Sequence, residues 1–285
     1  ANAETTTLPM KVYSMIKKGV SPEINALTTI IFGADLFTND FYKILIGFIS
    51  FSLMSSVIYI INDIIDYDLD KKTPVKKNKP ISSGKISKDK ALKISILTFF
   101  LSLILNYFTC SLFSYLYLLA YFLLNLFYSF YGKNIPYLDL LLIITFYIIR
   151  IDYGAMILNV TVSLILNLTV IFGSLYLILT KRRVEIENKK CRKVLKKYDK
   201  KRLRIFSIIS LILMLICYVI WCLMQHIKYI MFTPILVLLI FIRYDKEAKK
   251  SLDGNLVDVL LNDKILTLIC ILYGIIIISL LELYL

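Results

Sequence analysis

The sequence predicts an all-α, polytopic integral membrane protein with about nine transmembrane helices. Hydrophobic residues make up 58% of the 285 residues, and the mean hydropathy is +0.74, above the range of ordinary soluble domains. Apolar runs of roughly 20 residues, the length that a helix needs to cross a bilayer, recur along the chain. Lysines and arginines gather between these runs. Together, these observations indicate a helical bundle embedded in the lipid bilayer.

The predicted spans follow one another along most of the chain. They cover approximately residues 22–38, 41–66, 90–108, 110–131, 137–158, 162–180, 203–224, 228–243 and 264–285. Most of these runs have a length and an apolar content suited to a transmembrane helix. Pro22 and Asp35 interrupt the first run, and the eighth is short. The first and eighth are therefore the least regular elements of the predicted bundle.

The basic residues fall in alternate connections between the spans. Residues 67–90 include eight lysines, residues 181–204 include thirteen lysines and arginines, and residues 243–252 include four. The intervening connections hold almost none. Because cytoplasmic loops of membrane proteins carry the excess of Lys and Arg, the pattern predicts a cytoplasmic N-terminus and cytoplasmic charged loops.

The composition also limits the partners and the chemistry. The loops and the anionic lipid headgroups that they meet account for the net charge of +14. No nucleic-acid-binding module interrupts the spans, so we expect no nucleic-acid partner. The five cysteines include no C-x-x-C pair, which argues against a zinc site or a disulfide framework. The single histidine, His226, falls on the predicted non-cytoplasmic side, so a cytoplasmic mechanism must work without a histidine base.

The domain organisation is expected to be simple. Residues 1–9 do not begin with Met and resemble a remnant of cloning, with Met10 as the expected natural start. The remaining residues, 10–285, are expected to form a single membrane domain. Its cytoplasmic loops are expected near residues 67–90, 132–136, 181–204 and 243–263.

An acidic motif follows the second span directly. Asp63, Asp66 and Asp70 have the spacing i, i+3, i+7, so on a helix they share one face, which Asn62 borders and from which Asp68 points away. Three carboxylates on one face repel one another unless a cation lies between them. Oxygen ligands favour Mg²⁺ and leave coordination positions for phosphate oxygens. The motif therefore predicts a catalytic magnesium site with these four oxygen-bearing side chains (not Asp68) as metal ligands.

A basic loop follows the acidic motif. Three of its lysines can bind phosphate as point charges: Lys76, Lys77 and Lys79. The alternative is a solvated loop of mixed charge, which is the usual meaning of neighbouring acids and lysines. Against this alternative, the aspartates continue a helical face, and Pro74, Pro80 and Gly84 shape a turn-rich connection. We therefore expect a magnesium–diphosphate site at the membrane surface.

Other polar residues lie at or inside the span ends. Tyr128, Lys133 and Asp139 flank the short 132–136 connection, where Tyr and Lys also serve as interfacial anchors. Arg150 lies well inside the fifth span, and an ionisable group at that depth faces a partner helix or a cavity. For each of these residues, substrate binding and a purely structural role remain open.

The sixth span ends in a basic triplet. Lys181, Arg182 and Arg183 are followed by Glu185. The triplet can be a positive-inside stop signal, and its planar guanidinium groups also suit phosphate binding. No second D-x-x-x-D motif follows it.

Taken together, these residues resemble the UbiA superfamily of intramembrane prenyltransferases. That superfamily has nine helices around a cytoplasm-facing cavity and an N-D-x-x-D-x-x-x-D motif after the second helix, which Asn62, Asp63, Asp66 and Asp70 match. Within it, the chain is most similar to the polyprenyl-phosphate phosphoribosyltransferase branch. That branch has a Lys-Arg-Arg-x-Glu motif, matched by residues 181–185, and later Arg-Tyr and Leu-Leu-x-Asp motifs, matched by Arg243-Tyr244 and by residues 260–263. The family's Arg-Pro appears here as Lys79-Pro80.

The resemblance implies transfer of 5-phosphoribose from phosphoribosyl diphosphate to a polyprenyl phosphate, with Mg²⁺ as cofactor. The loop lysines would bind the phosphorylated donor, and Lys133, Lys181 or Arg182 the acceptor phosphate of the isoprenoid lipid. An alternative is prenyl transfer from a prenyl diphosphate to an aromatic or glycerophosphate acceptor, although that chemistry generally uses the second aspartate motif. A third possibility is a non-catalytic transporter or metal-binding membrane protein.

Overall fold

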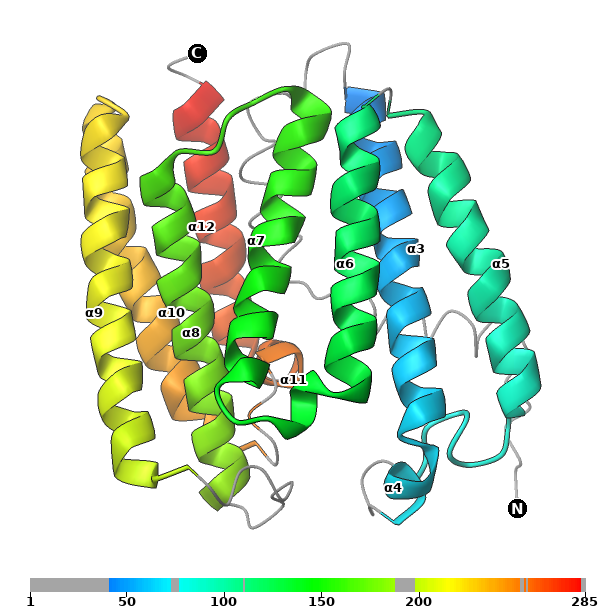
Figure 1. The fold of residues 1–285 in the computed structure, drawn as a ribbon. Helices are drawn as coiled ribbons and strands as arrows, with labels where there is room; N and C mark the ends of the chain where they lie inside the picture. Colours follow the sequence, from blue (N-terminus) through cyan, green and yellow to red (C-terminus); the bar gives the residue numbers. More distant parts are fainter. Residues whose placement is uncertain are drawn as a thin grey trace. The chain divides into compact units, whose positions relative to one another are not determined.

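The structure is a computed structural model that describes residues 41–72, 77–109, 111–187, 198–251, 254 and 256–282. The first predicted span, residues 1–9 and Lys76 lie outside the described residues. Every regular element in the described ranges is helical (Figure 1). The helices are α3 (Phe41–Ile65), α4 (Tyr67–Lys72), α5 (Lys88–Tyr107), α6 (Leu112–Phe130), η2 (Gly132–Asn134), α7 (Leu138–Leu158), α8 (Leu164–Glu187), α9 (Lys200–Met224), η4 (Lys228–Phe232), α10 (Thr233–Ala248), α11 (Leu256–Asn262) and α12 (Lys264–Glu282).

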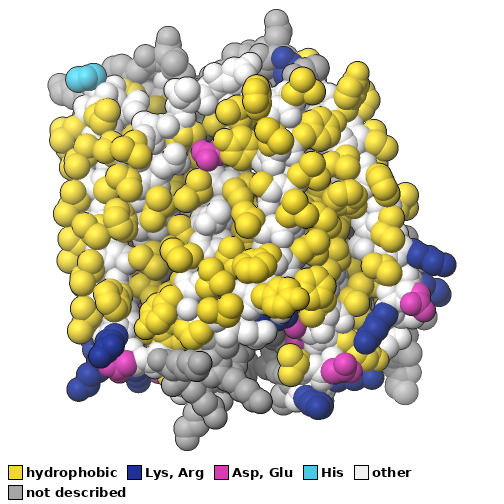
Figure 2. Space-filling model, in the orientation of Figure 1, with side chains coloured by type: hydrophobic (Ala, Val, Ile, Leu, Met, Phe, Trp, Pro, Cys, Tyr) yellow, Lys and Arg dark blue, Asp and Glu magenta, His cyan; other side chains and the backbone are white. Residues whose placement is uncertain are grey.

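Seven of these helices are long and apolar enough to cross a membrane: α3, α5, α6, α7, α8, α9 and α12. They coincide with the predicted second to seventh spans and with the ninth, so the prediction of an all-α integral membrane protein is confirmed. Large apolar side chains such as Leu97 and Leu268 stay exposed on them, and such side chains cover most of the helix surface visible in Figure 2. Lipid-facing helices require this coverage.

The structure differs from the prediction at several helix ends. The eighth predicted span, 228–243, is divided into η4 and the 16-residue helix α10, which has a proline in its first turn, the position that tolerates one. Helix α8 continues past the predicted end at residue 180 as far as Glu187. Short helices also form in two predicted loops, α4 within 67–90 and α11 within 243–263. In α4, acids at the start and lysines at the end complement the helix dipole.

The contacts divide the chain into two compact units, and the first contains α3, α4, α5 and α6. Helix α3 packs against α5 and α6. Near the middle of α3, Ser50 donates to the carbonyl of Ser102 at 2.9 Å, and Ser102 donates to the carbonyl of Ser50 at 2.8 Å. Small hydroxyl residues of this kind allow close helix packing within a membrane and replace an apolar contact with hydrogen bonds.

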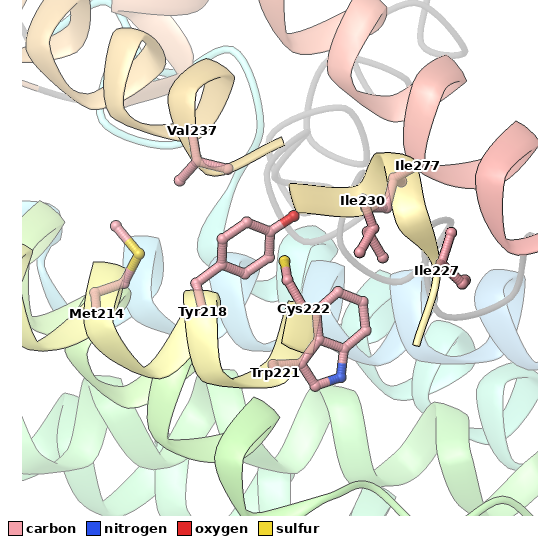
Figure 3. Close-up of a cluster of buried hydrophobic side chains, with 8 residues drawn as sticks. All are labelled: Met214, Tyr218, Trp221, Cys222, Ile227, Ile230, Val237 and Ile277. Atoms are coloured by element: carbon pink, nitrogen blue, oxygen red, sulfur yellow. The ribbon is translucent and has the colours of Figure 1, made fainter. Parts of the chain in front are cut away.

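The second unit contains α8 to α12 and most of α7. Helix α8 packs along α9, and α10 packs against α12. A buried cluster joins α9, α10 and α12, with Tyr218 at its centre (Figure 3). The Tyr218 ring stacks on Trp221, and its hydroxyl lies 2.9 Å from the hydroxyls of both Thr233 and Tyr273. The hydrogen bonds keep these polar groups satisfied inside an apolar cluster.

Candidate active site

The acidic motif lies where α3 passes into α4. The two helices are separated only by Asp66, and the helical path is almost continuous. The Asp66 amide donates to the Asn62 carbonyl at 2.9 Å, and the Asp70 amide donates to the Asp66 carbonyl at 2.8 Å. The aspartates therefore keep near-helical spacing across the junction. Asp66 and Asp70 are buried, whereas Asp68 is exposed.

Lys79 lies against this acidic face. Its ammonium nitrogen is 2.5 Å from Asp63 Oδ1 and 2.6 Å from Asp70 Oδ2. Burial alone would lower the pKa of Lys79, but the hydrogen bonds and negative charge of Asp63 and Asp70 raise it above its ordinary value. Lys79 therefore carries a positive charge shared by two carboxylates from successive helices.

The loop around Lys79 is firmly held in the first unit. Ile81 is fully buried and packs in a cluster with Ile60 of α3 and Ala91 of α5. The Lys79 carbonyl accepts from the Ser83 amide at 2.8 Å. The chain then turns at Gly84, whose φ of 76° suits a glycine. These contacts fix the backbone at Lys79 relative to the acidic motif.

The donor chemistry of this cluster fits a hard divalent cation. Asp63 and Asp70 already converge on one positive charge, and all the available ligand atoms are oxygens. Within the described residues, no group of three or more acidic, histidine or cysteine side chains is arranged as a metal cluster. Two convergent carboxylates are nevertheless enough for Mg²⁺, which commonly takes one or two protein carboxylates and completes its shell with substrate phosphates and water.

The other residues predicted to bind substrate, from the basic loop to the fifth span, are placed individually. Lys77 is exposed. Tyr128 is half-buried near the end of α6, Lys133 is half-buried in η2, and Arg150 is half-buried within α7. The roles predicted for these four side chains remain predictions.

In the second unit, Arg182 is enclosed by acidic partners. One guanidinium nitrogen is 3.1 Å from Asp139 Oδ2, and another is 2.9 Å from Glu185 Oε2. Asp139, which is only 2% exposed, also accepts a 2.9 Å hydrogen bond from the Tyr198 hydroxyl. Burial raises the pKa of Tyr198 to about 12, which keeps this hydroxyl a donor. We call Asp139, Arg182, Glu185 and Tyr198 the Arg182 cluster; it ties the start of α7 to the end of α8.

The two neighbours of Arg182 differ from each other. Arg183 is buried and forms an ion pair with Asp245 of α10, which also pairs with Lys249 at 2.6 Å. Lys181 is half-buried and forms no ion pair with a described residue. Of the triplet, the two arginines are thus engaged by carboxylates, whereas Lys181 is paired with no carboxylate among the described residues.

Sequence reasoning missed Tyr198 and Asp245 as members of these clusters. Asp139 and Tyr198 are 59 positions apart, and Arg183 and Asp245 are 62 apart, so no local spacing reveals the contacts. Arg243 and Asp263, noted only as late motif residues, form a two-point ion pair at 2.6 and 3.0 Å. The available signal was the position of each residue beside the polar end of an apolar run.

Comparison with known proteins identifies the family. The family model of the UbiA prenyltransferases matches residues 26–254, which is most of the chain. This chain belongs to the UbiA prenyltransferase family. The UbiA membership makes the protein an integral membrane transferase.

Curated relatives of this UbiA-family chain share one name. This chain is 28% identical over 184 residues to decaprenyl-phosphate phosphoribosyltransferase of Mycolicibacterium smegmatis. The match covers 63% of this chain and 58% of that protein. The chain is 25% identical over 242 residues to the enzyme of the same name from Mycobacterium tuberculosis, covering 80% of this chain and 78% of that protein. The chain thus spans less than two thirds of the first relative and more of the second.

Solved structures support the same fold. A UbiA homologue from Archaeoglobus fulgidus bound to GPP and Mg²⁺ superposes with a TM-score of 0.67 at 18% identity, over 94% of this chain and 99% of that one. A digeranylgeranylglyceryl phosphate synthase superposes with a TM-score of 0.66 at 19% identity, over 95% and 98%. The UbiA fold is therefore common to this chain and to a homologue with a prenyl diphosphate ligand.

Proposed function

We propose that this protein transfers 5-phosphoribose from phosphoribosyl diphosphate to a polyprenyl phosphate at the cytoplasmic side of the membrane. An oxygen of the lipid phosphate attacks C1 of the ribose. The bond between C1 and the diphosphate oxygen breaks, and diphosphate leaves with the electron pair. Because the acceptor is already an anion, the reaction needs no histidine base, in agreement with the sequence.

The acidic motif is assigned to the donor end of this reaction. Asp63, Asp66 and Asp70, with Asn62, would hold Mg²⁺, which neutralises charge on the departing diphosphate. Lys79 and Lys77 would contact donor phosphates as point charges. The convergence of Asp63 and Asp70 on one ammonium supports this assignment, because two carboxylates that share one cation can share another.

The observation that favours phosphoribosyl transfer over prenyl transfer is the Arg182 cluster with its neighbour Arg183. At the end of α8, Asp139 and Glu185 are compensated by Arg182, and Asp245 is compensated by Arg183 and Lys249. Carboxylates neutralised in this way have little need of a second metal ion. The decaprenyl-phosphate relatives, which carry the phosphoribosyltransferase name, support the same choice.

The decisive experiment compares donors directly. Membranes with the protein receive either a polyprenyl phosphate with radiolabelled phosphoribosyl diphosphate, or an aromatic or glycerophosphate acceptor with labelled geranylgeranyl diphosphate. We expect label to be transferred to the acceptor only from phosphoribosyl diphosphate, and only with a divalent cation. Label from the prenyl diphosphate alone would instead favour the prenyl transfer that the GPP-bound neighbour suggests.

Lys181 is the proposed contact for the acceptor phosphate. Replacing it with Gln should lower kcat/KM for the lipid phosphate about ten- to a hundredfold, mainly through KM, because one charge-assisted contact is lost. Steady-state kinetics with varied lipid phosphate would measure this. The matched control is Lys201→Gln, an exposed lysine of α9, which should leave the kinetics unchanged. Equal effects of both variants would contradict a specific role for Lys181.

Topology can be tested by labelling two exposed positions of the first unit. In a protein without native cysteines, a cysteine at Ser83 should react with an impermeant thiol reagent only from the cytoplasmic side. A cysteine at Asn159 should react only from outside. Both positions are exposed. Labelling of the two from the same side would show that the predicted number of crossings between them is wrong.

A further inference from the structure

The cation that Asp63 and Asp70 bind in this structure is part of the chain itself. Lys79 places its ammonium where the two carboxylates converge, at 2.5 and 2.6 Å. The Lys79 side chain is only 19% exposed, and that of Asp70 only 3%. An ammonium in this position provides the positive charge that a metal ion would otherwise provide.

We propose that Lys79 is an internal cation that a divalent metal ion displaces from Asp63 and Asp70, and that the released ammonium then binds the donor phosphates. The inference rests on the proposed function, because it takes these aspartates as the metal ligands. The proposal adds that metal binding precedes the contact between Lys79 and the donor. Lys79 stabilises the acidic face before metal binding, and it reaches the donor only afterwards.

The charges of the cluster favour this exchange. A divalent cation at the carboxylate oxygens that now hold Lys79 would place two positive charges where the ammonium places one, and would therefore compensate more of the negative charge of Asp63 and Asp70. A metal ion and an ammonium held by the same two carboxylates would be only a few ångströms apart, where like charges repel strongly at low dielectric. Metal binding at these oxygens therefore expels the ammonium.

The loop allows the ammonium to move without moving the backbone. The Lys79 carbonyl is held by the Ser83 amide at 2.8 Å, and the Pro80 carbonyl by the Ile86 amide at 3.0 Å. Ile81, which follows Pro80 in the chain, is fully buried. The flexible part is the four-carbon side chain of Lys79, which carries a compact charge. The family motif has an arginine at this position. A planar guanidinium group would bind carboxylates through two parallel hydrogen bonds and would release them less readily than an ammonium.

The first test measures the exposure of the ammonium. The full-length protein is treated briefly with an amine-acylating reagent, in EDTA or in Mg²⁺, and the modified lysines are quantified by mass spectrometry. We expect acylation of Lys79 to rise about tenfold in Mg²⁺, the change expected when a charge-assisted contact of this kind is released, while that of Lys85, an exposed lysine of the same loop, stays constant. Equal acylation of Lys79 in both conditions would overturn the proposal.

The second test measures metal affinity without any reaction. Mn²⁺ binding is followed by electron paramagnetic resonance for the wild type, Lys79→Met and the control Lys85→Met. Removing the competing ammonium should tighten Mn²⁺ binding about ten- to a hundredfold, the size expected for loss of its charge-assisted contacts, and the control should match the wild type. Unchanged or weaker binding by Lys79→Met would overturn the proposal. Lys79→Gln provides the same comparison if Lys79→Met does not fold.

Separate outcomes would contradict the proposed function and the displacement of Lys79. If Asp63→Asn leaves Mn²⁺ binding unchanged, the aspartates are not the metal site, and the proposed function fails together with the displacement. If Mn²⁺ binding depends on Asp63 but not on Lys79, the metal site stands, and only the displacement by metal is wrong.

Discussion

Asp63→Asn and Asp66→Asn are each expected to reduce phosphoribosyl transfer by about a hundredfold to a thousandfold or more, because each removes a charge from the proposed metal site at nearly constant shape. Both variants should remain folded because Asn is nearly the same shape as Asp, and the amide oxygen of Asp63→Asn can still accept from Lys79. Transfer rates at saturating substrate, together with gel filtration of the purified proteins, would measure both parts of this expectation.

The control for these variants lies in α4, directly after the α3–α4 junction. Asp68 is exposed, whereas Asp66 and Asp70 are buried, so Asp68→Asn should change the rate only slightly. A loss at Asp68 as large as that at Asp63 would mean that general negative charge, rather than one helical face, is what the reaction needs.

Arg182→Met is expected to destabilise the protein by about 3–5 kcal/mol, because it leaves the buried Asp139 carboxylate without its cation. The measurement is the free energy of unfolding in detergent, with thermal inactivation as a second readout. Lys181, at the adjacent position, forms no ion pair with a described residue, so Lys181→Met should leave stability unchanged.

A double variant separates structure from substrate binding. Replacing Arg182 and Asp139 together by Met and Leu removes both buried charges and should recover much of the lost stability. If Arg182→Met instead raises only the KM for the lipid phosphate at normal stability, Arg182 contacts the substrate, as the sequence first suggested.

The fold class was predictable because the bilayer imposes its own length scale. Seven apolar runs were long enough to be recognised without any knowledge of packing. The ends of the helices were harder to predict. Helix α8 continues through the charged residues 181–187 because Asp139 and Asp245, which are distant in sequence, compensate its arginines. A local hydropathy pattern does not contain that information.

In the candidate site, too, local spacing was predictable from the sequence, whereas side-chain pairing was not. The spacing of the aspartates alone indicated a shared cation, and the spacing is what the α3–α4 junction preserves. The sequence led us to predict Lys79 and Arg182 as phosphate ligands, but it did not reveal that carboxylates already hold them. Side-chain pairing depends on where loops and helix ends fold back, and Asp139 lies 43 positions from Arg182.

Ion pairs and hydrogen bonds hold the residues on both sides of the connection between α8 and α9. Glu187 pairs with Lys200 at 3.0 Å, and Tyr198 donates to Asp139 while accepting from the Tyr137 amide at 2.8 Å. These contacts are made by residues that flank 188–197. We therefore expect that a rigid domain inserted between Glu187 and Tyr198, for example to make a small membrane enzyme visible to electron microscopy, leaves the Arg182 cluster intact.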